Sequence, residues 1–255
     1  MKKLIDLNAD AGESLGRWTL GHDEQLLPMV SSVNVACGWH AGDPATMRRS
    51  VELARTGETA LGAHPGLPDL AGFGRRSMAL SPQEAADTCV YQYGALQAFA
   101  EGAGVPVRHV KAHGALYGLS LREPGVAAAI ADAVTERGMI TVLLAGPTAD
   151  RAQARGARVA REAFADLEYD DDGAIIIEPA PEPKDPQACA DKALGILRGS
   201  VRSTGGKEIA VEADTICIHG DRPNAVEVAG AITRAFAEEG VRMAPMAEVL
   251  AARGA

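Results

Sequence analysis

The sequence predicts an α/β fold, a single-domain (β/α) barrel-like structure of seven strands over residues 1–255. Short apolar runs rich in β-branched residues alternate with longer amphipathic stretches, which is typical of parallel strands joined by helices. The composition shows no break along the chain. About seven such units in 255 residues fit a closed or nearly closed barrel better than a small open sheet. An open doubly wound sheet is the alternative, although no GxGxxG motif follows the first strand.

The predicted strands are too short to be helices, and glycine bounds several of them. They comprise residues 4–8, 32–37, 60–63, 107–112, 140–145, 157–160 and 215–219. Helix starts follow several strands. Asp43-Pro44 and Asp185-Pro186 each place an N-cap before a proline, and Ser81 with Glu84 forms a capping box. The amphipathic stretches 81–102, 124–138, 185–199 and 223–240 are the predicted helices.

The charge balance restricts the class of partner. The chain has 25 basic and 34 acidic residues, a formal net charge of −9. This argues against nucleic acid and anionic membrane, which require a basic surface, and favours a small-molecule ligand. No signal peptide is visible, and no apolar run approaches the ~20 residues that span a bilayer. The four cysteines form no CxxC motif. We therefore expect reduced thiols and a cytoplasmic location.

One segment departs from the strand–helix alternation. Residues 166–186 are acidic and proline-rich. We interpret this segment as a solvated surface loop, and a lid over the site is the alternative.

The first strand is unusually polar. Asp6, Asn8 and Asp10 alternate with apolar residues, and Glu13 follows. Strands of a parallel barrel are buried on both faces, so these side chains would point into the barrel. Burying a carboxylate costs several kcal/mol unless it is paired, hydrogen-bonded or bound to metal. This pattern predicts a polar centre inside the barrel.

Titratable residues recur where other strands should end. Four of the six histidines lie there, with glycine within two residues of each: His40, His64, His113 and His219. Lys111 and Asp221 occupy similar positions. The carboxyl ends of barrel strands form the active site, so these ends predict a catalytic centre. Structural roles remain open for single residues, because Lys111 can neutralise a buried aspartate and Asp221 can cap a helix.

The residue types leave two chemistries open. Aspartate with several histidines suits a divalent metal, and aspartate with lysine and histidine suits metal-free acid–base work on an amide. No GxSxG elbow is present, and Gly205-Gly206-Lys207 is followed by Glu208, so it is no Walker A loop. Arg75 and Arg76, in a glycine-rich segment, can hold a carboxylate or phosphate or form a solvated turn.

The motifs at these strand ends resemble the LamB/YcsF family of 5-oxoprolinase A subunits. The resemblance is carried by residues 6–14 (DLNADAGES), 34–44 (NVACGWHAGDP), 62–69 (GAHPGLPD), 72–76 (GFGRR), 109–117 (HVKAHGALY) and 214–221 (DTICIHGD). It implies a seven-stranded barrel similar to glycoside hydrolases and polysaccharide deacetylases. It also implies ATP-dependent hydrolysis of the lactam of 5-oxoproline (pyroglutamate) to glutamate, performed with separate B and C subunits.

Several positions depart from the family pattern. Ala112 and Gly118 replace a proline and an asparagine of the usual HVKPHGALYN motif. Leu167 stands where the family usually has arginine, and Ile177-Glu178 replaces a proline–arginine pair. These changes remove one cationic group and reverse another, so they bear on the identity of the substrate.

The leading hypothesis is an ATP-dependent, lactam-hydrolysing subunit. Asp10 or Glu13 would be the general base, Lys111 the oxyanion stabiliser and His113 the proton donor, with His64 and Asp221 orienting them. The remaining candidates would bind substrate: Asn8, Asn34, Arg75, Arg76 and His219.

Two alternatives remain open. A metal-dependent deacylase acting on another cyclic amide or N-acyl substrate would use Asp10, His40 and His64 as metal ligands. A non-catalytic binding subunit of a larger complex would need none of these residues for activity.

Overall fold

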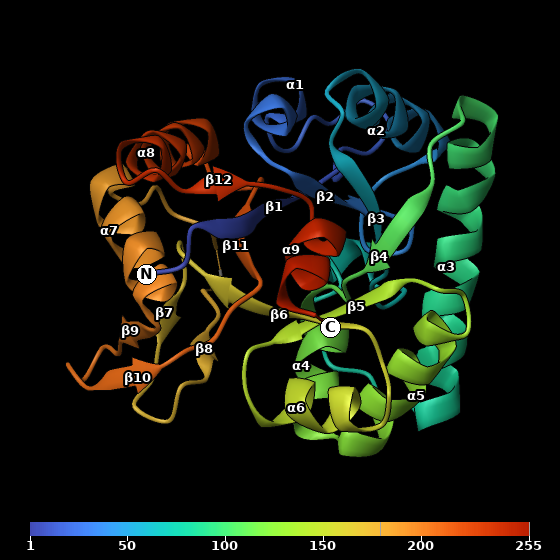
Figure 1. Ribbon diagram of the computed structural model, residues 1–255. Helices are drawn as coiled ribbons and strands as arrows, with labels where there is room; N and C mark the ends of the chain where they lie inside the picture. The colour runs from blue at the N-terminus through green and yellow to red at the C-terminus, as the bar shows by residue number, and fades with distance from the viewer. Residues whose placement is uncertain (179, 255) are drawn as a thin grey trace.

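The computed structural model describes residues 1–178 and 180–254. Seven parallel strands form its centre, and helices surround them (Figure 1). β1 pairs with both β2 and β11, which closes the sheet into a barrel of the order β1-β2-β3-β4-β5-β6-β11. The strands are β1 (Leu4–Ala11), β2 (Ser32–Ala36), β3 (Ala60–His64), β4 (Val107–Val110), β5 (Ile140–Leu144), β6 (Val159–Phe164) and β11 (Thr215–His219). The predicted seven-stranded barrel-like α/β fold is confirmed.

The helices begin where the sequence signals predict. Asp43 caps α2 by accepting bonds from the amides of Ala45 and Thr46, and Ser81 forms a capping box with Glu84 at the start of α3. Asp185 caps α7 in the same way as Asp43 caps α2. These helices are α2 (Pro44–Thr56), α3 (Pro82–Ala103), α5 (Pro124–Thr135), α7 (Pro186–Arg198) and α8 (Ala225–Glu238).

Further short elements were not predicted, because each is shorter than the pattern that a sequence reading detects. The helices are α1 (Asp23–Leu26), α4 (Gly114–Arg122), α6 (Pro147–Ala154) and α9 (Met246–Arg253), with 3₁₀ turns η1 (Leu27–Met29) and η2 (Leu70–Gly72). β12 (Arg242–Met243) pairs with the start of β1. Two hairpins complete the set: β7 (Glu168–Tyr169) with β8 (Ile175–Ile176), and β9 (Ser200–Arg202) with β10 (Glu208–Ala210).

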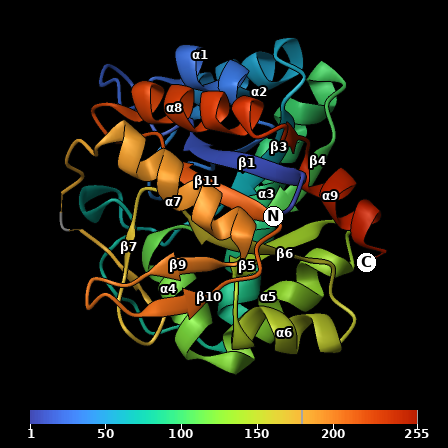
Figure 2. The same cartoon turned by 60° about the vertical axis from the view of Figure 1, so that its left-hand side comes forward.

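The two ends of the barrel differ. α9 packs its Met246 and Leu250 against Ile140 and Val142 of β5, across the end where the strands begin (Figure 1). α7 and α8 pack against each other on the side of β11 (Figure 2). The opposite end, where the strands finish, carries the polar residues described below.

The barrel interior is polar along β1, as its sequence predicts. Ile5 and Leu7 belong to the apolar core, whereas Asp6 accepts hydrogen bonds from the hydroxyls of Ser32 at 2.6 Å and Thr215 at 2.5 Å. Burial is the largest influence on Asp6 and raises its pKa to about 6. The hydrogen bonds therefore offset part of the cost of placing a carboxyl group inside the barrel.

The segment 166–186 is only in part the solvated loop that we expected. Asp171 and Asp172 are exposed, but Asp166, Leu167 and Tyr169 are buried. The hydroxyl of Tyr169 accepts a bond from the amide of Phe164 at 2.7 Å, which fixes the β7–β8 hairpin to the end of β6. The prediction was wrong for these residues because an acidic composition does not reveal single apolar anchors.

In the described part of the chain, no helix is both long enough and apolar enough to cross a membrane.

Candidate functional site

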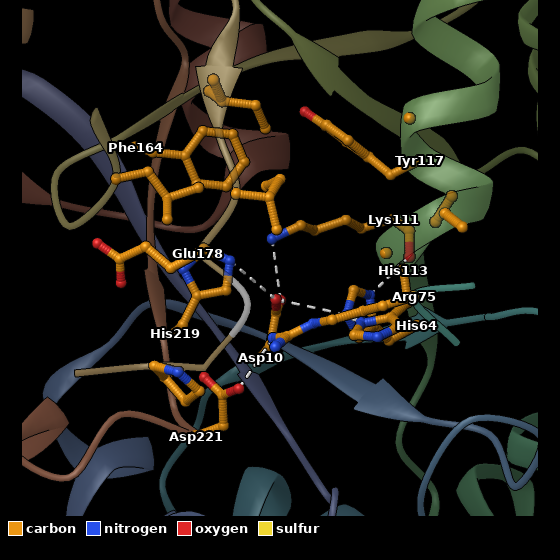
Figure 3. Close-up of a pocket in the computed structure, with 18 of the residues that line it drawn as sticks. Asp10, His64, Arg75, Lys111, His113, Tyr117, Phe164, Glu178, His219 and Asp221 are labelled. Carbon is orange, nitrogen blue, oxygen red and sulfur yellow. Dashed lines mark hydrogen bonds and ion pairs between the residues drawn. The ribbon is translucent and has the colours of Figure 1, made fainter. Parts of the chain in front are cut away.

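A cavity of about 260 Å³ opens at the carboxyl ends of the strands (Figure 3). Seven of the predicted site residues line it: Asp10, His64, Arg75, Lys111, His113, His219 and Asp221. Four others are buried at the strand ends or inside the barrel without lining the cavity: Asn8, Glu13, Asn34 and His40. Barrel topology therefore gathers residues that lie more than 200 positions apart in sequence.

Asp10 lies at the centre of this site (Figure 3). Its Oδ1 accepts hydrogen bonds from Nζ of Lys111 at 2.9 Å and from Nδ2 of Asn34 at 2.8 Å. Its Oδ2 lies 3.4 Å from Nε2 of His64 and 3.9 Å from Nε2 of His219. Burial by itself would raise the pKa of Asp10, but His64 and Lys111 outweigh it and hold the pKa well below its ordinary value. Asp10 is therefore a carboxylate.

Lys111 is a buried cation at the centre of the site. Besides Asp10, its Nζ lies 3.0 Å from Oε1 of Glu162 and 2.9 Å from Sγ of Cys217. Burial opposes the charge, but Asp10, Cys217 and Glu162 raise the pKa of Lys111 well above its ordinary value. The hydroxyl of Tyr117 donates to the other oxygen of Glu162 at 3.0 Å. The pairing of Lys111 with a first-strand aspartate, which the sequence suggests, is present.

His64 and His113 contact each other through their ring nitrogens. Nδ1 of His64 lies 2.8 Å from the carbonyl oxygen of Lys111, and Nε2 of His113 lies 2.7 Å from that of Phe73. The remaining nitrogens, Nε2 of His64 and Nδ1 of His113, are 3.0 Å apart. Burial, followed by His64, lowers the pKa of His113 well below its ordinary value, so His113 is neutral.

His219 is oriented by a carboxylate that the sequence analysis missed. Its Nδ1 lies 3.1 Å from both oxygens of Asp166, and Nε of Arg222 donates to Asp166 at 3.0 Å. Burial would lower the pKa of His219, but Asp166 outweighs it and raises the pKa above its ordinary value. The ring stacks on Phe164 with its Nε2 directed toward Asp10. This geometry suits a proton donor.

The two predicted arginines are separated. Arg75 lines the cavity, and its Nη2 lies 3.0 Å from Oδ2 of Asp221. Arg76 is instead largely exposed and forms an ion pair with Asp69 away from the cavity, with Nε donating at 2.8 Å. The structure therefore does not bring Arg76 to the candidate binding site.

Asn8 and Asn34 lie beneath the cavity, in a chain of buried hydrogen bonds. Nδ2 of Asn34 donates to Oδ1 of Asn8 at 2.7 Å, and Nε2 of His109 lies 2.9 Å from Oδ1 of Asn34. Nδ2 of Asn8 donates to Glu162 at 3.2 Å. These amides hold Asp10 and Glu162 in place. They do not line the cavity, so they would not contact a ligand directly.

Two groups of residues could hold a divalent cation. Donor atoms of Glu13, His40, His64 and His113 all lie within 4.8 Å of one another, and so do those of Asp10, Cys217 and His219. The structure therefore does not group the three metal ligands suggested by the sequence: His40 and His64 belong to the first group and Asp10 to the second. His40 groups with Glu13, whereas Asp10 is engaged by Lys111.

Further residues of the site could not be found from isolated sequence signals. Tyr117 and Arg122, on the short helix α4, line the cavity, whereas Glu162 in β6 and Asp166 lie behind Lys111 and His219. The position of Glu162 inside a strand that is expected to be buried is the one sequence signal that could have marked it as a site residue.

All five departures from the family pattern line this cavity: Ala112, Gly118, Leu167, Ile177 and Glu178. Glu178 accepts a bond from Nη1 of Arg222 at 2.9 Å and also pairs with Lys184. The changes are therefore concentrated where a ligand would bind.

Comparison with known proteins places this site in a family. The LamB/YcsF family profile matches residues 5–251. The 5-oxoprolinase A subunit of Pyrococcus furiosus is 44% identical over 96% of this chain and 99% of its own length. The 5-oxoprolinase A subunit of Bordetella pertussis is 47% identical over 94% of this chain and 98% of its own length.

Solved structures agree with this result. A lactam utilization protein from Thermus thermophilus superposes with a TM-score of 0.86 at 46% identity, covering 94% of this chain and 98% of the other. A deacetylase called T48 shares the fold alone, with a TM-score of 0.51 at 14% identity over 98% of this chain and 92% of the other. The resemblance seen in the sequence motifs is confirmed, and the chain belongs to the LamB/YcsF family.

Proposed function

We propose that this chain hydrolyses the lactam of 5-oxoproline to glutamate as the A subunit of an ATP-dependent 5-oxoprolinase, together with B and C subunits. The names of the relatives from Pyrococcus furiosus and Bordetella pertussis support the substrate and the existence of partner subunits. The observation that carries the proposal is the Asp10–Lys111 ion pair at the foot of the cavity, with His64 and His219 beside it.

The cavity suits a small cyclic amide. Its volume of about 260 Å³ lies below the ~300–1,000 Å³ of typical ligand pockets, so a five-membered lactam fits better than a larger ligand. Phe164, Leu167 and Ile177 give it apolar walls, and the charged groups lie at its foot. An amide is thereby held with its polar atoms toward Asp10 and Lys111.

Each chemical event has a candidate group. Water adds to the lactam carbonyl carbon, the ring C–N bond breaks, and the departing nitrogen takes a proton to become the amine of glutamate. Oδ2 of Asp10 would receive the proton of the attacking water, because Oδ1 is occupied by Lys111 and Asn34. Lys111 would stabilise the negative charge that develops on the carbonyl oxygen.

The geometry favours specific choices among the predicted roles. Burial, followed by Asp221 and Asp10, raises the pKa of Glu13 well above its ordinary value, so Asp10 suits the role of base better. His113 is neutral and directs its Nε2–H at the carbonyl of Phe73, so it has no proton to give to a substrate. We therefore assign proton donation to His219, oriented by Asp166, and positioning roles to His64 and Asp221.

Nothing in the described cavity marks a nucleotide site. Its volume of about 260 Å³ is small, and the segment Gly205-Gly206-Lys207-Glu208 lacks the serine or threonine of a phosphate-binding loop. We therefore derive no step through ATP on this chain and place its use with the partner subunits.

A metal-dependent deacylase is the second candidate, because the group formed by Glu13, His40, His64 and His113 could hold a divalent cation. Such an enzyme would release a carboxylic acid from an N-acyl substrate without ATP. A 5-oxoprolinase component would not hydrolyse N-acyl substrates in the absence of ATP.

The testing experiment is reconstitution. Purified chain is mixed with candidate B and C subunits, 5-oxoproline and ATP, and glutamate is measured. We expect glutamate only when this chain, its partners and ATP are all present. ATP-driven turnover by the isolated chain would contradict the assigned dependence on partners. Turnover of N-acyl substrates without ATP, and none of 5-oxoproline, would favour the deacylase.

A further inference from the structure

His40 is a buried histidine that lacks hydrogen-bond partners. Its side chain is fully buried, and neither Nδ1 nor Nε2 has a partner among the described residues. A buried polar group without a partner destabilises the fold, so a native protein that retains one requires an explanation. An ion that binds at this position would supply one.

The surrounding backbone holds His40 in place. A Cβ atom on Gly66 would lie 2.4 Å from Nδ1 of His40, and one on Gly74 would lie 2.7 Å from its Cβ. The absence of side chains at both glycines thus lets two loops close on this ring. Because Gly66 covers Nδ1, Nε2 is the nitrogen free to bind a ligand. It lies 4.0 Å from Oε1 of Glu13.

The neighbouring histidines direct two more ring nitrogens to the same place. Carbonyl oxygens only accept hydrogen bonds, so Nδ1 of His64 and Nε2 of His113 must carry hydrogens toward Lys111 and Phe73. The other two nitrogens, Nε2 of His64 and Nδ1 of His113, are 3.0 Å apart, so they cannot both carry hydrogens toward each other. At that distance a proton or a cation must lie between them.

This arrangement matches how proteins present histidine to a metal. A ligating imidazole normally donates its second N–H to a carbonyl or carboxylate, which fixes the tautomer. His64 and His113 both do so with backbone carbonyls. The ring of His113 also stacks on that of His40, with centroids 3.8 Å apart, and the His64 ring lies edge-on to both.

We propose that Glu13, His40, His64 and His113 bind one divalent first-row transition-metal ion, of which zinc is the best match. Their donor atoms lie within 4.8 Å of one another, and side-chain rotations would bring them to the ~3.3 Å between ligands of a tetrahedral zinc with bonds of about 2.0–2.1 Å. Three imidazoles and one carboxylate suit zinc, cobalt or nickel better than calcium or magnesium. The four residues follow or end β1, β2, β3 and β4, so neighbouring strands of the barrel hold the ion.

This inference stands apart from the proposed reaction, because it concerns binding in the absence of substrate. The full chain is stripped with a chelator and titrated with Co²⁺, while visible absorption and metal content are recorded. We expect one ion per chain with the absorption of a tetrahedral site, and competition by Zn²⁺. Catalytic assays play no part, so a negative result here leaves the lactam hydrolysis proposal standing.

Two variants and a control complete the test. H40Q and E13Q each remove one ligand, and each should weaken Co²⁺ binding by about 100-fold or more. H22Q removes an exposed histidine outside the cluster and should bind like the wild type. Thermal unfolding identifies any variant that fails to fold. Absence of Co²⁺ uptake by the wild type would overturn the proposal and assign a shared proton to His64 and His113. Wild-type affinity in folded H40Q and E13Q would overturn it equally.

Discussion

The ammonium group of Lys111 and the carboxylate of Asp10 form an ion pair at 2.9 Å inside the barrel, with each residue at most 3% exposed. Glu162 contacts the same ammonium at 3.0 Å. One lysine therefore pairs with two buried carboxylates, and its removal deletes the cation that they share.

The first prediction concerns Lys111→Met, which retains length and volume but deletes the charge. Turnover in the reconstituted complex should fall by about 10²-fold or more if Lys111 stabilises the oxyanion. The free energy of unfolding should also fall by about 3–5 kcal/mol, because Asp10 and Glu162 lose their counter-charge. Urea denaturation of the chain and glutamate release by the complex measure the two effects.

A double variant separates charge compensation from packing. Lys111→Met combined with Asp10→Asn removes both members of the pair, so it should be less destabilised than the sum of the single variants. Strict additivity would show that the pair contributes no coupling. If the Lys111→Met protein has wild-type stability and activity, Lys111 has neither the catalytic nor the charge-compensating role.

The second prediction concerns the pH dependence of activity. A proton donor must be protonated, and Asp166 raises the pKa of His219, so activity should persist to higher pH than an isolated histidine allows. Asp166→Asn should shift the alkaline limb of the kcat/KM profile to lower pH, and His219→Gln should abolish that limb. An alkaline limb that stays in place in Asp166→Asn would assign proton donation to another group.

The same pair affects stability with a definite sign. The pKa of His219 is higher in the folded protein, so its contribution is fully present below the unfolded value of about 6.5. The contribution is lost as pH rises through the folded pKa. Asp166→Asn should therefore destabilise the protein more at pH 6 than at pH 9, as measured by urea denaturation.

The third prediction concerns Asp6, which lies outside the cavity. Its pKa of about 6 exceeds the ordinary value of 3.8, so the folded state binds more protons than the unfolded state between these values. Asp6 should therefore make the free energy of unfolding decline as pH rises from about 4 to 6. Asp6→Asn should flatten that decline in urea titrations, and an unchanged slope would mean that Asp6 ionises normally.

The fourth prediction concerns recognition of the substrate carboxylate by Arg122. Arg75 pairs with Asp221, and Arg222 with Asp166, whereas Arg122 at the cavity has no ion-pair partner within residues 1–178 and 180–254. A Cβ on Gly118 would lie 3.1 Å from Nη1 of Arg122, so this glycine gives the guanidinium room over the cavity.

Arg122→Gln should raise KM for 5-oxoproline by about tenfold while kcat changes little, because a contact made equally in ground and transition states is lost. Arg76→Gln is the matched control, because Arg76 pairs with Asp69 outside the cavity. Gly118→Asn should act in the same direction as Arg122→Gln. An unchanged KM in Arg122→Gln would assign the carboxylate to another group.

The sequence predicts the barrel because strand–helix alternation and capping residues are local signals. Asp43, Ser81 and Asp185 cap helices where predicted. The polar face of β1 likewise predicts a buried centre, since period two applies to every strand. Asp10 lies at that centre and contacts four of the other predicted residues: Lys111, His64, His219 and Asn34.

The remaining features depend on distances that sequence patterns do not encode. Asp166 is 53 positions from His219, and its acidic neighbours conceal its burial. Arg75 and Arg76 are adjacent in sequence, yet only Arg75 reaches the cavity, because Asp69 captures Arg76. The grouping of His40 with Glu13 instead of Asp10 follows from how Gly66 and Gly74 close on the ring.

The most direct test of the central claim, that this cavity carries out lactam hydrolysis, is the rate of glutamate formation by complexes containing Asp10→Asn. Size-exclusion chromatography first confirms that the variant assembles with its partners, and the Arg76→Gln complex serves as the active control. We predict that Asp10→Asn lowers the rate by about 10²-fold or more at unchanged assembly. A fully assembled Asp10→Asn complex with the wild-type rate would contradict the account and leave the chain a non-catalytic binding subunit.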